Sequence, residues 1–236
     1  MNEPTRLLIH GASGRMGQAL IRLARERDDL RVVAAAARSA PDDLPAGATS
    51  VTAASLDSAP DFDVAIDFSL PEAFDAVLDL CVRRRVPLVS GTTGLSDAQR
   101  AAIDAAAMTI PVVWAANFSL GVAVLGDLVE RAAKVLAGWD CDIVEAHHIH
   151  KKDAPSGTAL ALGARAEAGG ASPHYASLRA GDIVGEHTVQ FATAGERIEL
   201  VHRATNRDIF ARGALHVARR LHGRAPGAYR VGDLLD

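Results

Sequence analysis

The chain of 236 residues is 49% hydrophobic and 23% charged, a composition typical of a globular protein and not of a disordered one. A formal net charge of −4 leaves no basic excess to neutralise a nucleic-acid backbone, so we expect no DNA or RNA partner. Charges interrupt every apolar stretch before membrane-spanning length, and the first residues (MNEPTR) lack a signal-peptide pattern. Two distant cysteines predict neither a disulfide framework nor a cysteine zinc site, and a reducing cytoplasm suits the chain.

The first half of the chain alternates short apolar strands with helices. The predicted strands are 6–10, 31–37, 63–68, 86–90 and 111–114; the predicted helices are 15–27, 71–84 and 96–107, with a proline-containing loop at 39–47. Strands that alternate with helices indicate a doubly wound, Rossmann-like parallel sheet with helices on both faces.

The second half has a different pattern. We expect helices at 121–136, 155–167 and 208–221, a histidine-rich strand at 141–149, and alternating strands at 187–193 and 197–202. This is an α+β domain on a mostly antiparallel sheet. The predicted division is a dinucleotide-binding domain at 1–117, to which 208–236 returns, and a substrate-binding and tetramerisation domain at 118–207.

A glycine-rich turn, GASGRMG at 11–17, joins the first predicted strand to the first helix. Glycines there allow a tight turn and close approach of backbone N–H groups to a pyrophosphate, which a helix N-terminus also attracts. The spacing G-x-x-G-x-x-G departs from the usual dinucleotide fingerprint, and a strand-to-helix turn without a ligand is the alternative.

The end of the second strand lacks the acidic residue that usually binds the adenosine ribose. It reads AAARS, so Ala37 stands near the expected carboxylate position and Arg38 follows. Arg38 and Ser39 suit a ribose 2′-phosphate; alternatively, Arg38 is a solvated charge at a strand end. The loops GTTG (91–94) and AANFS (115–119) follow later strands and are expected at the same edge of the sheet.

The segment EAHHIHKKDAPSGT (145–158) concentrates titratable side chains before a predicted helix start. Clustered histidine and lysine suit recognition of a dianion and proton transfer near neutral pH, and the helix start offers N–H groups to a carboxylate. Zinc is the competing explanation for the histidines, but no carboxylate or cysteine completes an evident site, so we expect no metal. A surface strand followed by a capped helix is the non-functional alternative.

This segment resembles the signature of the 4-hydroxy-tetrahydrodipicolinate (dihydrodipicolinate) reductase family. The turn GASGRMG, the loops GTTG and AANFS, and RAGDIVGEH at 179–187 match the family in the same order. The resemblance implies an NAD(P)H-dependent oxidoreductase of the diaminopimelate route to lysine. Its substrate is a small cyclic dicarboxylate, which is reduced with loss of water, and its tetramers form through the sheets of the second domain.

The resemblance also implies roles for individual residues. His147 corresponds to the acid/base histidine, Lys151 to the proton-donating lysine and His148 to a substrate contact, while Gly157 and Thr158 match the group that binds a substrate carboxylate. The implied cofactor contacts are Gly11, Ala12, Ser13, Gly14, Arg15, Met16, Gly91, Thr92, Thr93, Ala115, Ala116, Asn117 and Phe118, to which we add Arg38.

Two departures from the family matter. With Ala37 in place of the acidic residue that many members carry, we expect NADPH to be used at least as well as NADH. The segment between Thr158 and Arg179 is short compared with the family, so the sequence does not predict the rim of the tetramer interface. Two other functions remain as alternatives: another two-domain NAD(P)-dependent dehydrogenase, and a redox regulator of the same fold with a degenerate site.

Overall fold

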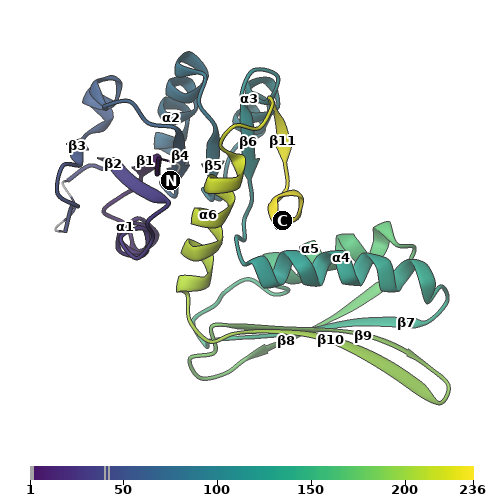
Figure 1. Ribbon diagram of the computed structural model, residues 1–236. Helices are drawn as coiled ribbons and strands as arrows, with labels where there is room; N and C mark the ends of the chain where they lie inside the picture. The colour runs from purple at the N-terminus through teal and green to yellow at the C-terminus, as the bar shows by residue number, and fades with distance from the viewer. Residues whose placement is uncertain (1–2, 40, 42) are drawn as a thin grey trace. The chain divides into compact units, whose positions relative to one another are not determined.

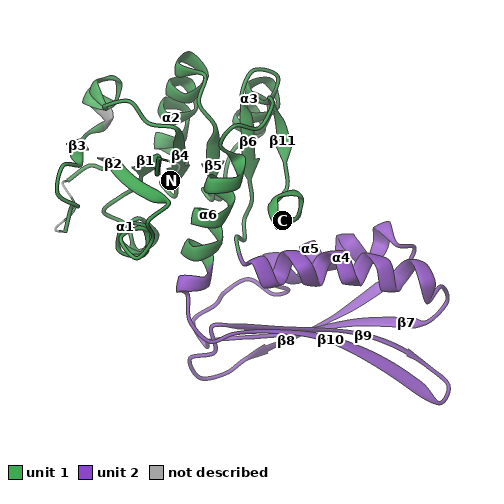
Figure 2. Cartoon of the chain, viewed as in Figure 1, with its two compact units in different colours: residues 1–118, 210–236 green, residues 119–209 purple. Residues whose placement is uncertain are grey.

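The computed structural model describes residues 3–39, 41 and 43–236, so residues 40 and 42 of the predicted loop at 39–47 lie outside it. Two compact units are present: Met1–Phe118 with Phe210–Asp236 form unit 1, and Ser119–Ile209 form unit 2 (Figure 2). Each contains its own sheet and its own hydrophobic core.

Unit 1 is built on a parallel sheet in the order β11-β6-β5-β4-β1-β2-β3, flanked by helices (Figure 1). Its strands are β1 (Thr5–His10), β2 (Leu30–Ala36), β3 (Thr49–Val51), β4 (Val64–Asp67), β5 (Leu88–Ser90), β6 (Pro111–Trp114) and β11 (Gly227–Tyr229). Its helices are α1 (Arg15–Ala24), α2 (Pro71–Arg84), α3 (Asp97–Ala107) and, from Phe210 onward, α6 (Asp208–Leu221), with 3-10 turns η1 (Ala53–Ser58) and η2 (Val231–Leu234). Because the strands are parallel, their carboxyl ends meet at one edge of the sheet.

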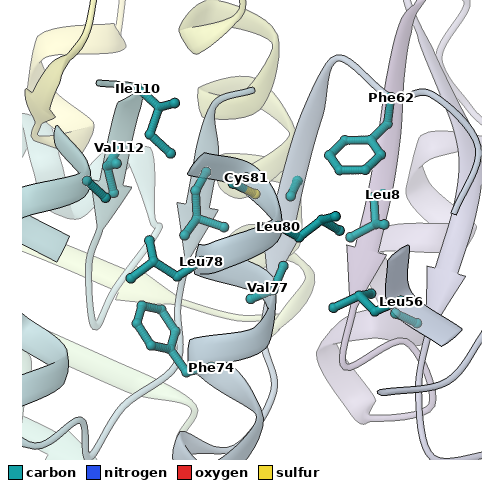
Figure 3. Close-up of a cluster of buried hydrophobic side chains, with 14 of the residues drawn as sticks. Leu8, Leu56, Phe62, Phe74, Val77, Leu78, Leu80, Cys81, Ile110 and Val112 are labelled. Carbon is teal, nitrogen blue, oxygen red and sulfur yellow. The ribbon is translucent and has the colours of Figure 1, made fainter. Parts of the chain in front are cut away.

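Aliphatic side chains fill the core of unit 1. On α2, Phe74, Val77 and Cys81 recur at helical spacing and are fully buried against the sheet, where Leu8 and Val112 lie (Figure 3). Cys81 and Cys141 are both unpaired by disulfide and buried, and burial raises the pKa of the Cys81 thiol far above its usual range. Neither thiol is therefore a ready nucleophile at neutral pH.

Unit 2 has a four-stranded sheet in the order β10-β9-β7-β8, with α4 (Leu120–Val135) and α5 (Gly157–Ala168) on one face (Figure 1). The strands are β7 (Asp140–His147), β8 (Pro173–Arg179), β9 (Gly185–Thr193) and β10 (Glu196–Ala204). β9 pairs antiparallel with β7 and β10, whereas β8 pairs parallel with β7. The predicted fold class, a parallel sheet joined to a mostly antiparallel second domain, is confirmed.

Some predicted bounds differ from those in the structure, and some strands were not predicted. The strand predicted to run to residue 149 ends at His147. His148–His150 lie in the segment that follows it, where the N–H of Lys151 donates to the carbonyl of His148 and the chain turns. The predicted helix at 155–167 begins at Gly157. The strands β3, β8 and β11 were not predicted.

Candidate active site

The glycine-rich turn lies at the carboxyl edge of the unit 1 sheet, between β1 and α1. Gly11 has a φ of 78°, and a Cβ there would be 2.4 Å from the carbonyl oxygen of Phe68, so only glycine fits. α1 begins after Gly14, no side chain of the described residues caps it, and its first turn carries no acidic residue. Ser13, Gly14 and Arg15 are exposed. This helix start therefore offers N–H groups to an anion, which fits a nucleotide diphosphate.

A buried carboxylate organises the neighbouring loops. Asp67, at the end of β4, is fully buried and accepts hydrogen bonds from Ser90 Oγ and Thr92 Oγ1, both at 2.7 Å. His10 Nδ1 lies 2.8 Å from its other oxygen. Burial would raise the pKa of Asp67, but these hydrogen bonds and the nearby His10 hold it below its usual range. Asp67 thus fixes the loop containing Gly91, Thr92 and Thr93, a role that the sequence analysis missed although the residue ends a buried strand.

The third predicted cofactor loop follows β6. Ala115 to Asn117 are partly or largely exposed, whereas the ring of Phe118 is buried against Phe68 with ring centroids 5.5 Å apart. Arg38 is exposed, just beyond the end of β2, and forms no ion pair with any residue that the structure describes.

In unit 2 a second buried carboxylate lies beside the predicted acid/base histidine. Glu145 Oε2 is 2.5 Å from His147 Nδ1, and the guanidinium of Arg179 donates to both carboxylate oxygens at 2.8 and 2.9 Å. Glu145 is 1% exposed and His147 is 8% exposed. The sequence analysis assigned no role to Glu145 or Arg179; the available signal was the two-residue spacing of Glu145 and His147, which puts both on one face of a strand.

Lys151 and His148 flank this cluster in sequence. Lys151 Nζ lies 2.9 Å from Asp153 Oδ2, so its charge already has a partner. His148 Nδ1 is buried without a hydrogen-bond partner among the described residues. Burial lowers the pKa of His148, and the nearby Arg207, histidines and Lys151 lower it further, so the ring favours its neutral form.

The start of α5 completes the predicted substrate site. Ser156 caps the helix by accepting the N–H of Ala159 at 3.1 Å, and its own N–H donates to Glu145 Oε1 at 3.3 Å. A Cβ at Gly157 would meet no atom within 4 Å, so open space borders the first turn. The cap therefore leaves room over the helix start, where Gly157 and Thr158 lie near the Glu145 cluster.

Two other features are absent from the described residues. Their His, Cys, Asp and Glu side chains form no group of three or more that could hold a metal ion. In the same part of the chain, no helix is both long and apolar enough to cross a membrane.

A parallel sheet with a helix start open to anions at its carboxyl edge is typical of NAD(P)-dependent enzymes. Unit 2 adds a buried histidine–carboxylate pair, a lysine and a helix N-terminus, which are groups suited to proton transfer and to carboxylate binding. Fold and site together define a two-domain NAD(P)-dependent oxidoreductase.

The chain belongs to the dihydrodipicolinate reductase family. Models of the N-terminus and C-terminus of dihydrodipicolinate reductase match residues 5–118 and 121–235, respectively. The chain is 70% identical over its full length to the complete 4-hydroxy-tetrahydrodipicolinate reductase of Stenotrophomonas maltophilia. Identity to the reductase of Xanthomonas campestris is 65% over 99% of this chain and 98% of that one. The predicted family and enzyme class are confirmed, and the match to the N-terminal domain supports binding of NAD(P)H.

Solved structures agree on the fold. A dipicolinate-bound dihydrodipicolinate reductase from Paenisporosarcina sp. TG-14 superimposes with a TM-score of 0.81 at 22% identity, covering 98% of this chain and all of that one. A diaminopimelate dehydrogenase from C. glutamicum gives a TM-score of 0.62 at 16% identity, over 98% and 94% of the two chains. The second likeness shows that the architecture is shared with other dehydrogenases, so the fold alone does not identify the reductase.

Proposed function

We propose that this chain reduces 4-hydroxy-tetrahydrodipicolinate to tetrahydrodipicolinate, with unit 1 binding the cofactor and unit 2 the substrate. The observation that carries the proposal is that Glu145 forms hydrogen bonds with His147 and with the N–H of Ser156, and so links the histidine to the start of α5. The family membership of the whole chain supports the same reaction.

In unit 1, the N–H groups at the start of α1 bind the cofactor diphosphate, and the loops that follow β5 and β6 border the rest of the nucleotide. The cofactor supplies a hydride, and the substrate is reduced with uptake of one proton and departure of its hydroxyl as water. The buried Asp67 holds the loop at Thr92 before any ligand arrives, which lowers the entropic cost of binding.

The substrate that unit 2 binds carries two carboxylates. One accepts hydrogen bonds from the N–H groups of Gly157 and Thr158 and from the Thr158 hydroxyl, while Lys151 and His148 lie toward the other. Lys151 and His147 exchange the protons that assist hydroxyl loss and complete reduction. Lys151 must exchange its contact with Asp153 for the substrate.

Four further features belong to this proposal. NADPH serves at least as well as NADH because Ala37 neither binds the ribose hydroxyls nor repels a 2′-phosphate. Catalysis proceeds without a metal, since hydride transfer from NAD(P)H needs none. The protein works in the cytoplasm. The face of the unit 2 sheet opposite α4 and α5 joins copies of the chain into a homotetramer.

Dipicolinate is the probe for the substrate site, because it is a stable planar dicarboxylate and is bound in the Paenisporosarcina structure. Calorimetric titration of this protein should show binding that weakens by at least tenfold in Thr158→Val. The exposed neighbour Lys152 provides a control, since Lys152→Ala should bind dipicolinate as the native protein does. Equal affinities for native protein and Thr158→Val would remove the carboxylate role of the α5 start.

A further inference from the structure

One buried carboxylate joins three separate segments of unit 2. Glu145 on β7 accepts hydrogen bonds from His147 on the same strand, from Arg179 at the end of β8, and from the N–H of Ser156 before α5. Arg179 also donates to the carbonyl of Asp153 at 2.5 Å. The predicted acid/base histidine and the predicted carboxylate-binding helix end therefore form hydrogen bonds with the same carboxylate, that of Glu145.

The charge of Glu145 fixes which ring nitrogen of His147 carries a hydrogen. Burial raises the pKa of Glu145, but hydrogen bonds from Arg179, Ser177 and His147 lower it to about 2. Glu145 is then a carboxylate at neutral pH and can only accept, so His147 Nδ1 must donate. The proton that His147 exchanges is consequently the one on Nε2.

Gly185 lies beside the other ring nitrogen of His147. A Cβ at Gly185, the first residue of β9, would lie 3.1 Å from His147 Nε2, closer than ordinary contact. Glycine at this position keeps a side chain away from Nε2. Because Glu145 occupies Nδ1 and Gly185 has no side chain to cover Nε2, Nε2 is the ring nitrogen that exchanges a proton.

We propose that Glu145, held by Arg179, is a positioning residue for proton transfer: it sets the tautomer and orientation of His147 and ties that ring to the start of α5. The proposal rests on the acid/base role proposed for His147. Glu145 itself touches neither substrate nor cofactor, since it is enclosed by His147, Arg179 and Ser156.

Other titratable groups surround the pair. β9 contributes His187, whose ring lies 5.2 Å from that of His147. His202 on β10 and Lys151 in the loop after β7 lie near His187, and His148 in the same loop lies near His147. Burial and the charge of His147 lower the pKa of His187 to about 4, and burial lowers the pKa of His202. The negative charge that contacts the His147 ring is that of Glu145.

The test is Glu145→Gln, which keeps the shape of the side chain and removes its charge. We expect kcat to fall about 10- to 100-fold, while the affinity for dipicolinate stays within about threefold of native. The kcat–pH profile of Glu145→Gln should be displaced from the native profile, because the negative charge beside the ring is lost. Glu145→Asp, which restores the charge on a shorter arm, should recover part of kcat.

Glu167→Gln is the matched control, since Glu167 is exposed near the end of α5 and should leave every measurement unchanged. The proposal is overturned if Glu145→Gln keeps native kcat and an unmoved pH profile. It is also overturned if dipicolinate affinity is lost in step with kcat while the profile stays in place, since that pattern marks a purely structural role.

Nitrogen NMR of His147 separates this inference from the proposed function. The native protein should show a hydrogen on Nδ1 at neutral pH, and Glu145→Gln should show a mixture of tautomers, whether or not the protein reduces the proposed substrate. A single unchanged tautomer in both proteins would contradict the positioning role even if the reductase activity is present.

Discussion

Lys151 is the cation that the proposed reaction uses most directly, and it is only 22% exposed beside Asp153. Removing it takes away both a proton donor and a charge facing the dianion. Lys151→Ala should therefore lower kcat by roughly 10²–10³ in a steady-state assay.

Lys152→Ala provides the comparison, because Lys152 is the next residue, carries the same charge and is exposed. Its kcat should stay within about twofold of native. Similar losses in both variants would mean that general positive charge matters, and a native kcat in Lys151→Ala would end its proposed role.

The proposed cofactor preference rests on Ala37 and Arg38, which lie just after the end of β2. Ala37→Glu should shift the ratio of kcat/KM values toward NADH, since a carboxylate binds the ribose hydroxyls and repels a 2′-phosphate. Arg38→Ala should weaken the binding of NADPH and leave that of NADH unchanged. A well-formed arginine–phosphate contact contributes about 1.5–3 kcal/mol to binding, and the exposure of Arg38 reduces this contribution.

The native ratio is the reference for both changes. A strong preference of the native protein for NADH would refute the prediction that NADPH is used at least as well. An unchanged ratio in Arg38→Ala would leave the missing carboxylate as the sole cause of NADPH use.

Among the elements of unit 2, the described helices α4 and α5 cover one face of the sheet, and no described helix of this unit covers the other (Figure 1). Leu178 on β8 is 57% exposed and Val201 on β10 is 41% exposed, and register puts both on the face opposite the buried residues Ile143 and Val189. If this face joins copies of the chain, Leu178→Arg should reduce the mass measured by light scattering.

The activity of Leu178→Arg need not change for this result to count. Glu167→Gln on α5 should leave the mass at the native value. A mass for Leu178→Arg equal to that of a native tetramer would place the interface elsewhere, and a monomeric native protein would remove it altogether.

The helices and long strands could be predicted because their apolar residues recur with a clear period. α2 and α3 begin and end within a residue of their predicted bounds, since Pro71 and Ser96 mark their starts. β3 and β11 have three residues each, too few for a periodic signal. β8 begins at Pro173 and is mostly exposed, so its pairing with β7 depends on contacts distant in sequence.

The individual side chains of the candidate site were visible in the sequence, but their partners were not. Nothing in the segment 145–158 specifies that Arg179, from another strand, donates to Glu145. Asp67 and Thr92 are similarly distant in sequence, and only the parallel pairing of β4 with β5 brings their loops together.

For the whole molecule, acid should remove a contribution of Glu145 to stability. Its pKa is about 2 in the folded protein and 4.5 for the ordinary group, so the contribution is complete above about pH 4.5 and disappears as pH falls toward 2. The shift corresponds to about 3 kcal/mol at most. Urea unfolding should show that Glu145→Gln is destabilised at pH 7 and that the gap from native narrows between pH 4.5 and 3; a gap independent of pH would contradict this.

The central claim is reduction of one cyclic dicarboxylate by NAD(P)H. The substrate is unstable, so it should be generated in the cuvette from pyruvate and aspartate semialdehyde by a coupled synthase, with the loss of NAD(P)H absorbance as the signal. We expect oxidation of NADPH, at least as efficient as that of NADH, that depends on every component and persists after treatment with a chelator. A well-folded sample that oxidises neither cofactor under these conditions would contradict it.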